Sequence, residues 1–233
     1  MSTIPVRCRV ERGGGRSVTA LSTDLYSSGL RSVHADLRAT DAWRVRYADG
    51  RCVVLPLHKW CGYPDDADRE VLSRCAEPTL DVGCGPGRLV AALAAEGRQA
   101  LGVDIARSAV QLARHAGAAV VRRSVFDALP AEGTWSTVLL IDGNIGIGGD
   151  PVKLLQRCHQ LLVLGGTVIV EFDPPQAPTA AQWVRIEDGE RRSEWFRWAH
   201  VSVDHAEPMV HAAGLRVVDI WHRAGRWFGC LEQ

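Results

Sequence analysis

From residue 79 onwards, short apolar runs alternate with amphipathic segments. The apolar runs predict strands over residues 79–83, 99–104, 118–123, 137–142 and 166–172. Helices are predicted between them, near residues 86–96, 106–116 and 150–162. Gly97 and Gly117 follow two of these helices, and Asp150 with Pro151 supplies an N-cap and a first-turn proline for the third. This alternation is typical of a parallel sheet covered by helices on both faces.

The alternation stops after residue 173. Residues 183–188 and 191–200 predict a hairpin that turns at Asp188-Gly189, inside an insertion over 174–200. A helix is expected over 204–213 with Asp204 as its N-cap, followed by strands over 215–221 and 226–231. The predicted fold class is therefore α/β, with a Rossmann-like, seven-stranded, mostly parallel sheet, helices on both faces and an antiparallel C-terminal strand pair.

The N-terminal part has a different pattern, which predicts an extension made of a helix and a hairpin. Residues 1–22 contain Gly13-Gly14-Gly15 among polar residues and are expected to form a flexible tail. A helix is predicted over 23–38, a hairpin over 43–57 around Asp49-Gly50, and a helix with acids in its first turn over 65–75. We expect residues 23–64 to form a cap on a main domain that spans 65–233.

Composition excludes several classes of protein. The chain has 46% apolar and 23% charged residues, with 27 basic and 27 acidic side chains, which gives no sign of a nucleic-acid partner. Its longest apolar runs are too short to span a membrane, and arginines interrupt residues 1–20 where a secretory signal would be apolar, so a cytoplasmic location is expected. Seven cysteines without a C-x-x-C pair predict neither a disulfide framework nor a metal site. The oligomeric state stays open.

The most informative stretch is LDVGCGPGRL, residues 80–89, where a strand leads through three alternate glycines into a helix. Glycines allow a sharp turn and a close approach of a ligand to backbone N–H groups and the helix N-terminus. Ordinary tight turns also use glycine. The next strand ends in LGVD, however, and Asp104 is placed to accept hydrogen bonds from the two hydroxyls of a ribose, or else to cap the helix that follows.

The same loop indicates which nucleotide cofactor is bound. Its glycines stand at 83, 85 and 87, whereas dinucleotide enzymes usually carry Gly-x-Gly-x-x-Gly. Asp81 precedes the first of these glycines by two residues. A buried acid there would attract a cationic amino-acid group and repel a pyrophosphate. The loop therefore favours S-adenosylmethionine over a nicotinamide cofactor.

At these residues the sequence resembles the class I S-adenosylmethionine-dependent methyltransferases. LDVGCGPGRL is similar to their first motif, LGVDIA to their ribose-binding strand and LLVLGGTVIVEF to their helix-to-fifth-strand segment, and the resemblance covers roughly residues 65–173. The layout is also similar to that of small bacterial methyltransferases of unassigned substrate. The resemblance implies that Gly83, Cys84 and Gly85 line the methionine part, that Asp104 binds the ribose, and that Ile105 packs on the adenine.

The adenine edge is expected to meet RRSVFDALP, residues 122–130, where Ser124 stands at a position at which the family commonly has an acid. Ser124 and the Val125 N–H are the predicted contacts, and Asp127 is the alternative to Ser124. Cys84 is interpreted as a packing residue and not as a nucleophile.

Acceptor-side groups are predicted at the end of the fourth strand, in LLIDGNIGIGGD, residues 139–150. Asp142, Gly143 and Asn144 should face the transferred methyl group, with Asp142 and Gly143 also beside the cofactor and Asp142 and Asn144 as candidate catalytic residues. His58 in PLHKWCGY is a candidate general base or a surface residue. The aromatic residues of the later hairpin line a pocket or pack it on the sheet; they are Trp183, Trp195, Phe196 and Trp198.

These features predict a methyltransferase that moves a methyl group to a small-molecule acceptor, on an oxygen, nitrogen or carbon atom, mainly by proximity and orientation. An aminopropyl-type transferase on the same fold is one alternative, although Asn144 among glycines lacks the acids that it would need. A non-catalytic cofactor-binding module is another, although Asp81, Gly83, Gly85 and Asp104 are all present.

Overall fold

The computed structural model describes residues 20–35 and 43–233. Helix α1 spans Ala20–Ala35 and so begins three residues before its predicted start. The remainder of the predicted tail, residues 1–19, and the predicted end of this helix, residues 36–38, lie outside the described residues.

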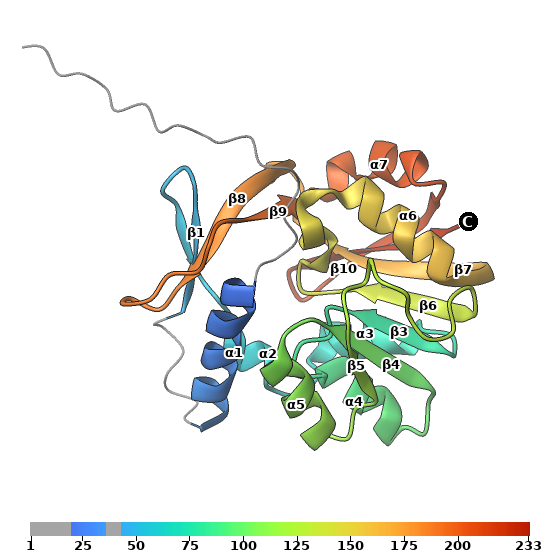
Figure 1. The fold of residues 1–233 in the computed structure, drawn as a ribbon. Helices are drawn as coiled ribbons and strands as arrows, with labels where there is room; N and C mark the ends of the chain where they lie inside the picture. The colour runs from blue at the N-terminus through green and yellow to red at the C-terminus, as the bar shows by residue number, and fades with distance from the viewer. Residues whose placement is uncertain (1–19, 36–42) are drawn as a thin grey trace, which may run out of the picture.

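The main domain is built on a seven-stranded sheet with the strand order β10-β11-β7-β6-β3-β4-β5 (Figure 1). Its strands are β3 (Thr79–Val82), β4 (Ala100–Asp104), β5 (Val120–Arg122), β6 (Trp135–Leu140), β7 (Leu162–Phe172), β10 (Arg216–Arg223) and β11 (Arg226–Glu232). β3 to β7 pair in parallel, while β11 pairs antiparallel with both β7 and β10. The predicted Rossmann-like sheet and its antiparallel C-terminal pair are confirmed.

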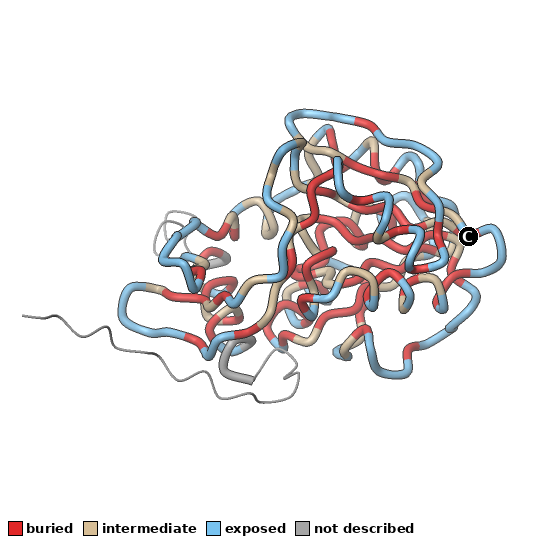
Figure 2. The backbone as a smooth tube through the Cα atoms, turned by 90° about the horizontal axis from the view of Figure 1, so that it is seen from above, coloured by how far each residue is buried: buried red, intermediate tan, exposed pale blue. Residues whose placement is uncertain are grey.

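Helices cover both faces of this sheet because the end of the central strand β6 and the residue after it form a run of consecutive apolar residues, 138–141, whose side chains point to both faces. In β6, Val138 and Leu140 pack towards α6 (Pro151–Leu161) and α7 (Ala206–Ala212) on one face. Leu139 and the following Ile141 pack on the other face, towards α3 (Asp66–Ser73) and α4 (Arg88–Ala95). α5 (Arg107–His115) lies on this second face and packs against α4 and β5. Figure 2 shows the buried positions concentrated in the interior of the molecule.

A second sheet forms a cap beside the carboxyl ends of the core strands, with the order β2-β1-β8-β9. It combines β1 (Arg44–Tyr47) and β2 (Cys52–Val54) with β8 (Ala180–Glu187) and β9 (Phe196–His200). β1 pairs antiparallel with β8, so the N-terminal hairpin and the later insertion form one sheet, as Figure 1 shows to the left of the core. We call this unit the cap sheet.

Short helical turns replace some predicted elements. Residues Leu57–Trp60 form the short helix α2 where the second hairpin strand was expected to end, and Asn144–Gly149 form the 3-10 turn η1. The predicted N-cap Asp204 is wrong, because it lies inside the 3-10 turn η2 (Val203–His205), where Ser202 accepts the hydrogen bond instead. The N-cap Asp150 is confirmed, since its carboxylate accepts the Lys153 N–H at 3.1 Å. No described helix is long and apolar enough to cross a membrane.

Candidate active site

The glycine loop between β3 and α4 is held in a conformation that needs glycine. Gly83, Gly85 and Gly87 have φ angles of 73°, 54° and 83°, in the left-handed region that other residues rarely adopt. A Cβ atom on Gly83 would lie 2.7 Å from Asn144 Nδ2, and one on Gly87 would lie 2.7 Å from Ala113 Cβ in α5. The loop is therefore packed on both sides, and its backbone is left to face the cavity beside it.

Asp104, at the end of β4, anchors this loop through its carboxylate. Its carboxylate accepts the Gly85 N–H at 2.9 Å and the Ala106 N–H at 2.7 Å, so the side chain both anchors the glycine loop and turns the chain into α5. Burial raises the pKa of Asp104, and the backbone N–H groups oppose that increase. Each carboxylate oxygen has two lone pairs, so both oxygens can still accept a ribose hydroxyl.

Asp81 is the most unusual acid of the site. Its side chain is 3% exposed, lines the cavity and accepts no hydrogen bond from any residue that the structure describes. Burial, followed by the charges of Asp142 and Asp104, raises the pKa of Asp81 to about 8. An uncompensated buried carboxyl of this kind favours a cationic ligand group, which would provide the missing partner.

Asn144 joins the end of β6 to the end of β3. Its side-chain amide donates to the Val82 carbonyl at 2.9 Å and to the Gly83 carbonyl at 3.0 Å. Both amide hydrogens are therefore used to hold the glycine loop, and only the Oδ1 atom is left for a ligand. This geometry makes Asn144 a positioning residue for the loop. Gly143, its neighbour, has a φ of 81° and lines the same cavity.

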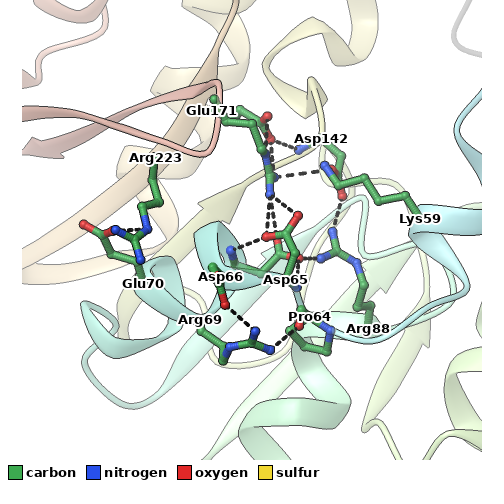
Figure 3. A network of polar contacts seen from close by, with 12 residues as sticks. Lys59, Pro64, Asp65, Asp66, Arg69, Glu70, Arg88, Asp142, Glu171 and Arg223 are labelled. Carbon is green, nitrogen blue, oxygen red and sulfur yellow. Dashed lines mark hydrogen bonds and ion pairs between the residues drawn. The ribbon is translucent and has the colours of Figure 1, made fainter.

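Asp142 belongs to a network of buried ion pairs behind the cavity (Figure 3). Its carboxylate accepts from Lys59 Nζ at 2.7 Å and Arg88 Nη2 at 2.5 Å, and Arg226 Nη2 lies 3.4 Å away. Burial acts to raise the pKa of Asp142, but the positive charges of Arg88, Lys59 and Arg226 outweigh it and hold the pKa below the ordinary value. Asp142 is therefore a charged, fully engaged carboxylate.

Arg226 extends this network to three more acids. It binds Glu171 through two hydrogen bonds of 2.8 and 2.7 Å and Asp68 at 2.8 Å, and it lies 3.3 Å from both oxygens of Asp65. Arg88 pairs with the fully buried Asp68 as well. Sequence reasoning missed both arginines, because no local pattern shows that two distant residues share one buried acid.

The cap sheet and α1 close over the loop and leave a cavity of about 1120 Å³. The cavity is lined by Asp81, Gly85 and Asp142 from the core and by Trp60 and Trp198 from the two additions. Tyr26 of α1 stands above the glycine loop, since a Cβ atom on Gly85 would lie 3.2 Å from its hydroxyl oxygen. The N-terminal extension and the later insertion thus both line one cavity.

His58 is not brought into this cavity. The single turn of α2 points His58 to solvent, where it is exposed, while its neighbours Lys59 and Trp60 line the cavity. Cys84 is placed for packing, because its Sγ atom would lie 2.6 Å from a Cβ atom on Gly102. Burial raises the pKa of the Cys84 thiol well above its usual value and keeps it protonated.

The segment that was predicted to contact the adenine lines the same cavity. Ile105, Ser124, Val125 and Asp127 all line it. The Ser124 hydroxyl accepts the Phe126 N–H at 3.2 Å, and the Asp127 N–H donates to the Ser124 carbonyl at 3.1 Å. Both side chains are thus within the same tight turn, and the geometry leaves Ser124 and Asp127 as alternatives.

A second polar group, which sequence reasoning also missed, lies at the carboxyl end of β7. The Tyr47 hydroxyl is 2.9 Å from His200 Nε2, and His200 Nδ1 is 3.1 Å from Asp173 Oδ2. All three side chains line the cavity. They come from β1, β9 and the residue after β7, so only the tertiary fold brings them together.

Comparisons with known proteins identify a similar domain and a similar fold. Residues 79–166 match the family described as Methyltransferase domain. A ubiquinone biosynthesis O-methyltransferase from Azotobacter vinelandii is 29% identical over 142 residues, which are 58% of this chain and 61% of that protein. One from Cereibacter sphaeroides is 30% identical over 151 residues, 60% of each chain. This chain thus spans about three fifths of the length of the curated relatives that it matches.

Solved structures share the fold at low sequence identity. A S-adenosylmethionine-dependent methyltransferase from Bacteroides fragilis, in complex with S-adenosylhomocysteine, has a TM-score of 0.75 at 17% identity and covers 94% of this chain and 98% of its own. The 1,6-didemethyltoxoflavin-N1-methyltransferase from Burkholderia thailandensis has a TM-score of 0.57 at 17% identity, over 98% and 93% of the two chains. Residues 79–166 therefore match a methyltransferase domain, and the chain shares its fold with S-adenosylmethionine-dependent methyltransferases.

Proposed function

We propose that this protein is a S-adenosylmethionine-dependent methyltransferase that acts on a small-molecule acceptor. The observation that carries this proposal is a single cavity with two unlike walls. The glycine loop and the buried acids Asp81 and Asp104 form one wall, and the apolar cap sheet forms the other. One wall suits a cationic nucleoside and the other suits an organic acceptor.

Different residues of the first wall suit the methionine, ribose and adenine parts of the cofactor. The unpartnered carboxyl of Asp81 suits the ammonium group of the methionine part, and the carboxylate of Asp104 suits the ribose hydroxyls. The apolar side chains of Ile105 and Val125 suit the faces of an adenine ring, and Ser124 or Asp127 suits its polar edge. When bound, S-adenosylmethionine supplies a methyl group activated by a sulfonium charge.

The chain itself contributes orientation and exclusion of water. Asn144 and Asp104 hold the glycine loop from two sides, which fixes where the methyl group would stand. Trp60, Trp198 and Tyr26 cover the cavity from the cap, which keeps an acceptor beside that point. Proximity and alignment of this kind lower a reaction barrier by roughly 7 to 11 kcal/mol.

The structure gives less support to an aminopropyl-type transferase. That reaction requires acids that bind a polyamine in the acceptor loop, and the turn Asn144–Gly149 carries none. Asp142, which precedes it, is already paired with Lys59 and Arg88. The names of the relatives support small acceptors, on oxygen for the ubiquinone biosynthesis enzymes and on nitrogen for the Burkholderia enzyme.

Calorimetry with the full chain tests the cofactor assignment. We expect S-adenosylmethionine and S-adenosylhomocysteine to bind without added metal, and Asp104→Asn to weaken both at least tenfold, because charge-assisted hydrogen bonds contribute roughly 1.5 to 3 kcal/mol. Asp127→Asn separates the two candidates for the adenine contact. An unchanged affinity for S-adenosylmethionine would exclude Asp127 and favour Ser124. Absence of binding heat from folded protein at millimolar ligand would refute the cofactor. A screen of acceptors for S-adenosylhomocysteine formation then tests turnover.

A further inference from the structure

We propose that Tyr47, His200 and Asp173 form a proton relay that accepts the proton of the methyl acceptor, so that the acceptor is an apolar molecule with a hydroxyl group, such as a phenol. The inference rests on the proposed function and goes beyond it, because it names the class of acceptor and the residues that activate it. We call the three side chains the relay.

The geometry of the relay fixes the direction in which a proton moves. Asp173 Oδ2 accepts from His200 Nδ1 at 3.1 Å, and the same oxygen accepts the Val201 N–H at 3.1 Å, which holds the carboxylate in place. With its proton on Nδ1, the ring has a free lone pair on Nε2. That lone pair accepts the Tyr47 O–H at 2.9 Å. The chain of bonds therefore runs from Tyr47 to His200 to Asp173.

The relay lies at the edge of the sheet where chemistry is expected. Asp173 directly follows β7, and β7 is the parallel neighbour of β6, whose chain continues into Asp142. The Asp142 N–H donates to Glu171 Oε2 at 2.6 Å, two residues before Asp173. Tyr47, His200 and Asp173 line the same cavity as Gly85 and Asp142. The relay thus lies at the same sheet edge as Asp142 and lines the same cavity.

Burial is the main reason why Tyr47 stays protonated and able to donate. Burial raises the pKa of Tyr47, Asp173 raises it further, and the Arg51 guanidinium, 4.5 Å above the Tyr47 ring, opposes them. Tyr47 is 8% exposed, so water does not compete strongly for its hydroxyl. Arg51 itself is held by Asp49 at 2.7 Å on the outer side of the hairpin. The groups that face His200 are therefore Tyr47, Asp173 and, through Tyr47, Arg51.

Most of the remaining acceptor wall is apolar. The cap sheet and its flanks line the cavity with Val45, Leu55, Val184, Ile186, Phe196 and Trp198. Two charged side chains on this side, Lys59 and Asp142, are paired with each other, and Arg197 of β9 lies 5.6 Å over the Trp183 ring. An aromatic or alkyl body with one hydroxyl matches this wall, because the relay is then the partner for its polar atom.

The proposed step balances in atoms and electrons. The acceptor oxygen forms a bond to the methyl carbon while the carbon–sulfur bond breaks and leaves its electron pair on the sulfur. The hydroxyl proton passes to the Tyr47 oxygen as the proton of Tyr47 passes to His200 Nε2. Asp173 stabilises the resulting imidazolium, which then releases its proton to solvent. Phenolic hydroxyls have pKa values of about 10, so most are protonated at neutral pH and gain from such a base.

Binding of 4-nitrophenol tests the relay without turnover, because its phenolate absorbs visible light. In the presence of S-adenosylhomocysteine, we expect the bound probe to ionise at least one pH unit lower than the free probe. His200→Asn, Tyr47→Phe and Asp173→Asn should abolish this shift. His58→Asn, at an exposed histidine outside the cavity, is the matched control and should retain it. Thermal melts of each variant report whether it is folded.

Two results would overturn the relay: an unshifted ionisation of the bound probe, or the same shift in folded His200→Asn. Failure of 4-nitrophenol to bind at millimolar concentration while S-adenosylhomocysteine binds also refutes the acceptor class, but leaves the proposed function standing. If neither binds, the proposed function fails. With a hydroxyl acceptor that is turned over, His200→Asn should lower kcat about 100-fold with little change in KM.

Discussion

The ammonium of Lys59 lies 2.7 Å from the carboxylate of Asp142, and this ion pair joins the cap to the core. Lys59 belongs to α2, whereas Asp142 follows the central strand β6. The two side chains are 29% and 18% exposed. The pair therefore lies at the wall of the cavity, where solvent still reaches Lys59 but Asp142 is mostly shielded.

Removing either partner of this pair should have unequal effects on stability. Lys59→Gln should lower the free energy of unfolding by about 1 kcal/mol or less, because a partly exposed lysine gains little from its pair and Asp142 keeps Arg88. Asp142→Asn should cost about 3 kcal/mol, because it removes a shared acid from two buried arginines. Urea unfolding measures both. A larger loss for Lys59→Gln than for Asp142→Asn would contradict this assignment.

Arg226 should be the most important cation of the network. Its side chain is 12% exposed and pairs with Glu171, Asp65, Asp68 and Asp142. We expect Arg226→Met to destabilise the fold by about 3 to 5 kcal/mol, because it leaves buried carboxylates without compensation. Arg223→Met, at an exposed arginine of β10 whose Nε atom is 3.6 Å from Glu70, is the matched control and should change stability by less than about 1 kcal/mol. Equal losses in the two variants would argue against a buried network.

The sequence predicted the core sheet well because its signals are local. Alternating apolar runs, Gly97, Gly117 and the Asp150 cap each act over a few residues, and the glycine loop with Asp81 and Asp104 follows a single strand-helix-strand unit. The cap sheet could be predicted only as two hairpins. The pairing of β1 with β8 depends on contacts between residues more than 100 positions apart, such as Val45 with Ile186, and no local pattern records it.

The same limit applies to the site. Asp142 and Asn144 could be placed at the cavity because both follow a central strand, but their roles depend on partners from elsewhere in the chain. Lys59 and Arg226 occupy the Asp142 carboxylate, and Val82 and Gly83 occupy the Asn144 amide. His58 was a candidate base because it stands just before the core in sequence, whereas His200 is identified only by the fold, which gives it oriented partners.

Asp81 should make the stability of the protein depend on pH. Its pKa is raised to about 8 in the folded chain, so the folded state holds its proton more tightly than the unfolded state does. Stability from this residue is therefore lost as the pH rises from the ordinary carboxyl range towards 8, by up to about 1.4 kcal/mol per pH unit. The parent chain should therefore lose stability as the pH rises from 5 to 8, whereas Asp81→Asn should not lose this contribution. Urea unfolding at both values checks this, and parallel pH dependence in the two proteins would disprove it.

The same substitution should weaken binding of the cofactor. If Asp81 binds the ammonium of the methionine part, Asp81→Asn should lower the affinity for S-adenosylmethionine at least tenfold in calorimetry. 5′-Methylthioadenosine lacks that ammonium and is the matched ligand, so its affinity should be equal for the parent and the variant. A comparable loss of affinity for both ligands would mean that the substitution distorts the loop and that Asp81 does not bind the ammonium group.

The glycine loop offers a final prediction that separates backbone strain from loss of the site. Gly83→Ala places a Cβ atom 2.7 Å from Asn144 Nδ2 at a φ of 73° and should break the hold of Asn144 on the loop. Gly97→Ala has nearly the same φ, 74°, but its Cβ atom would meet nothing within 4 Å. Both variants should lose roughly 1 to 2 kcal/mol of stability from the left-handed backbone. Only Gly83→Ala should also lose S-adenosylhomocysteine binding, by a factor that calorimetry measures against Gly97→Ala. Equal affinities in the two variants would mean that the contact between Asn144 and the loop does not shape the cofactor site.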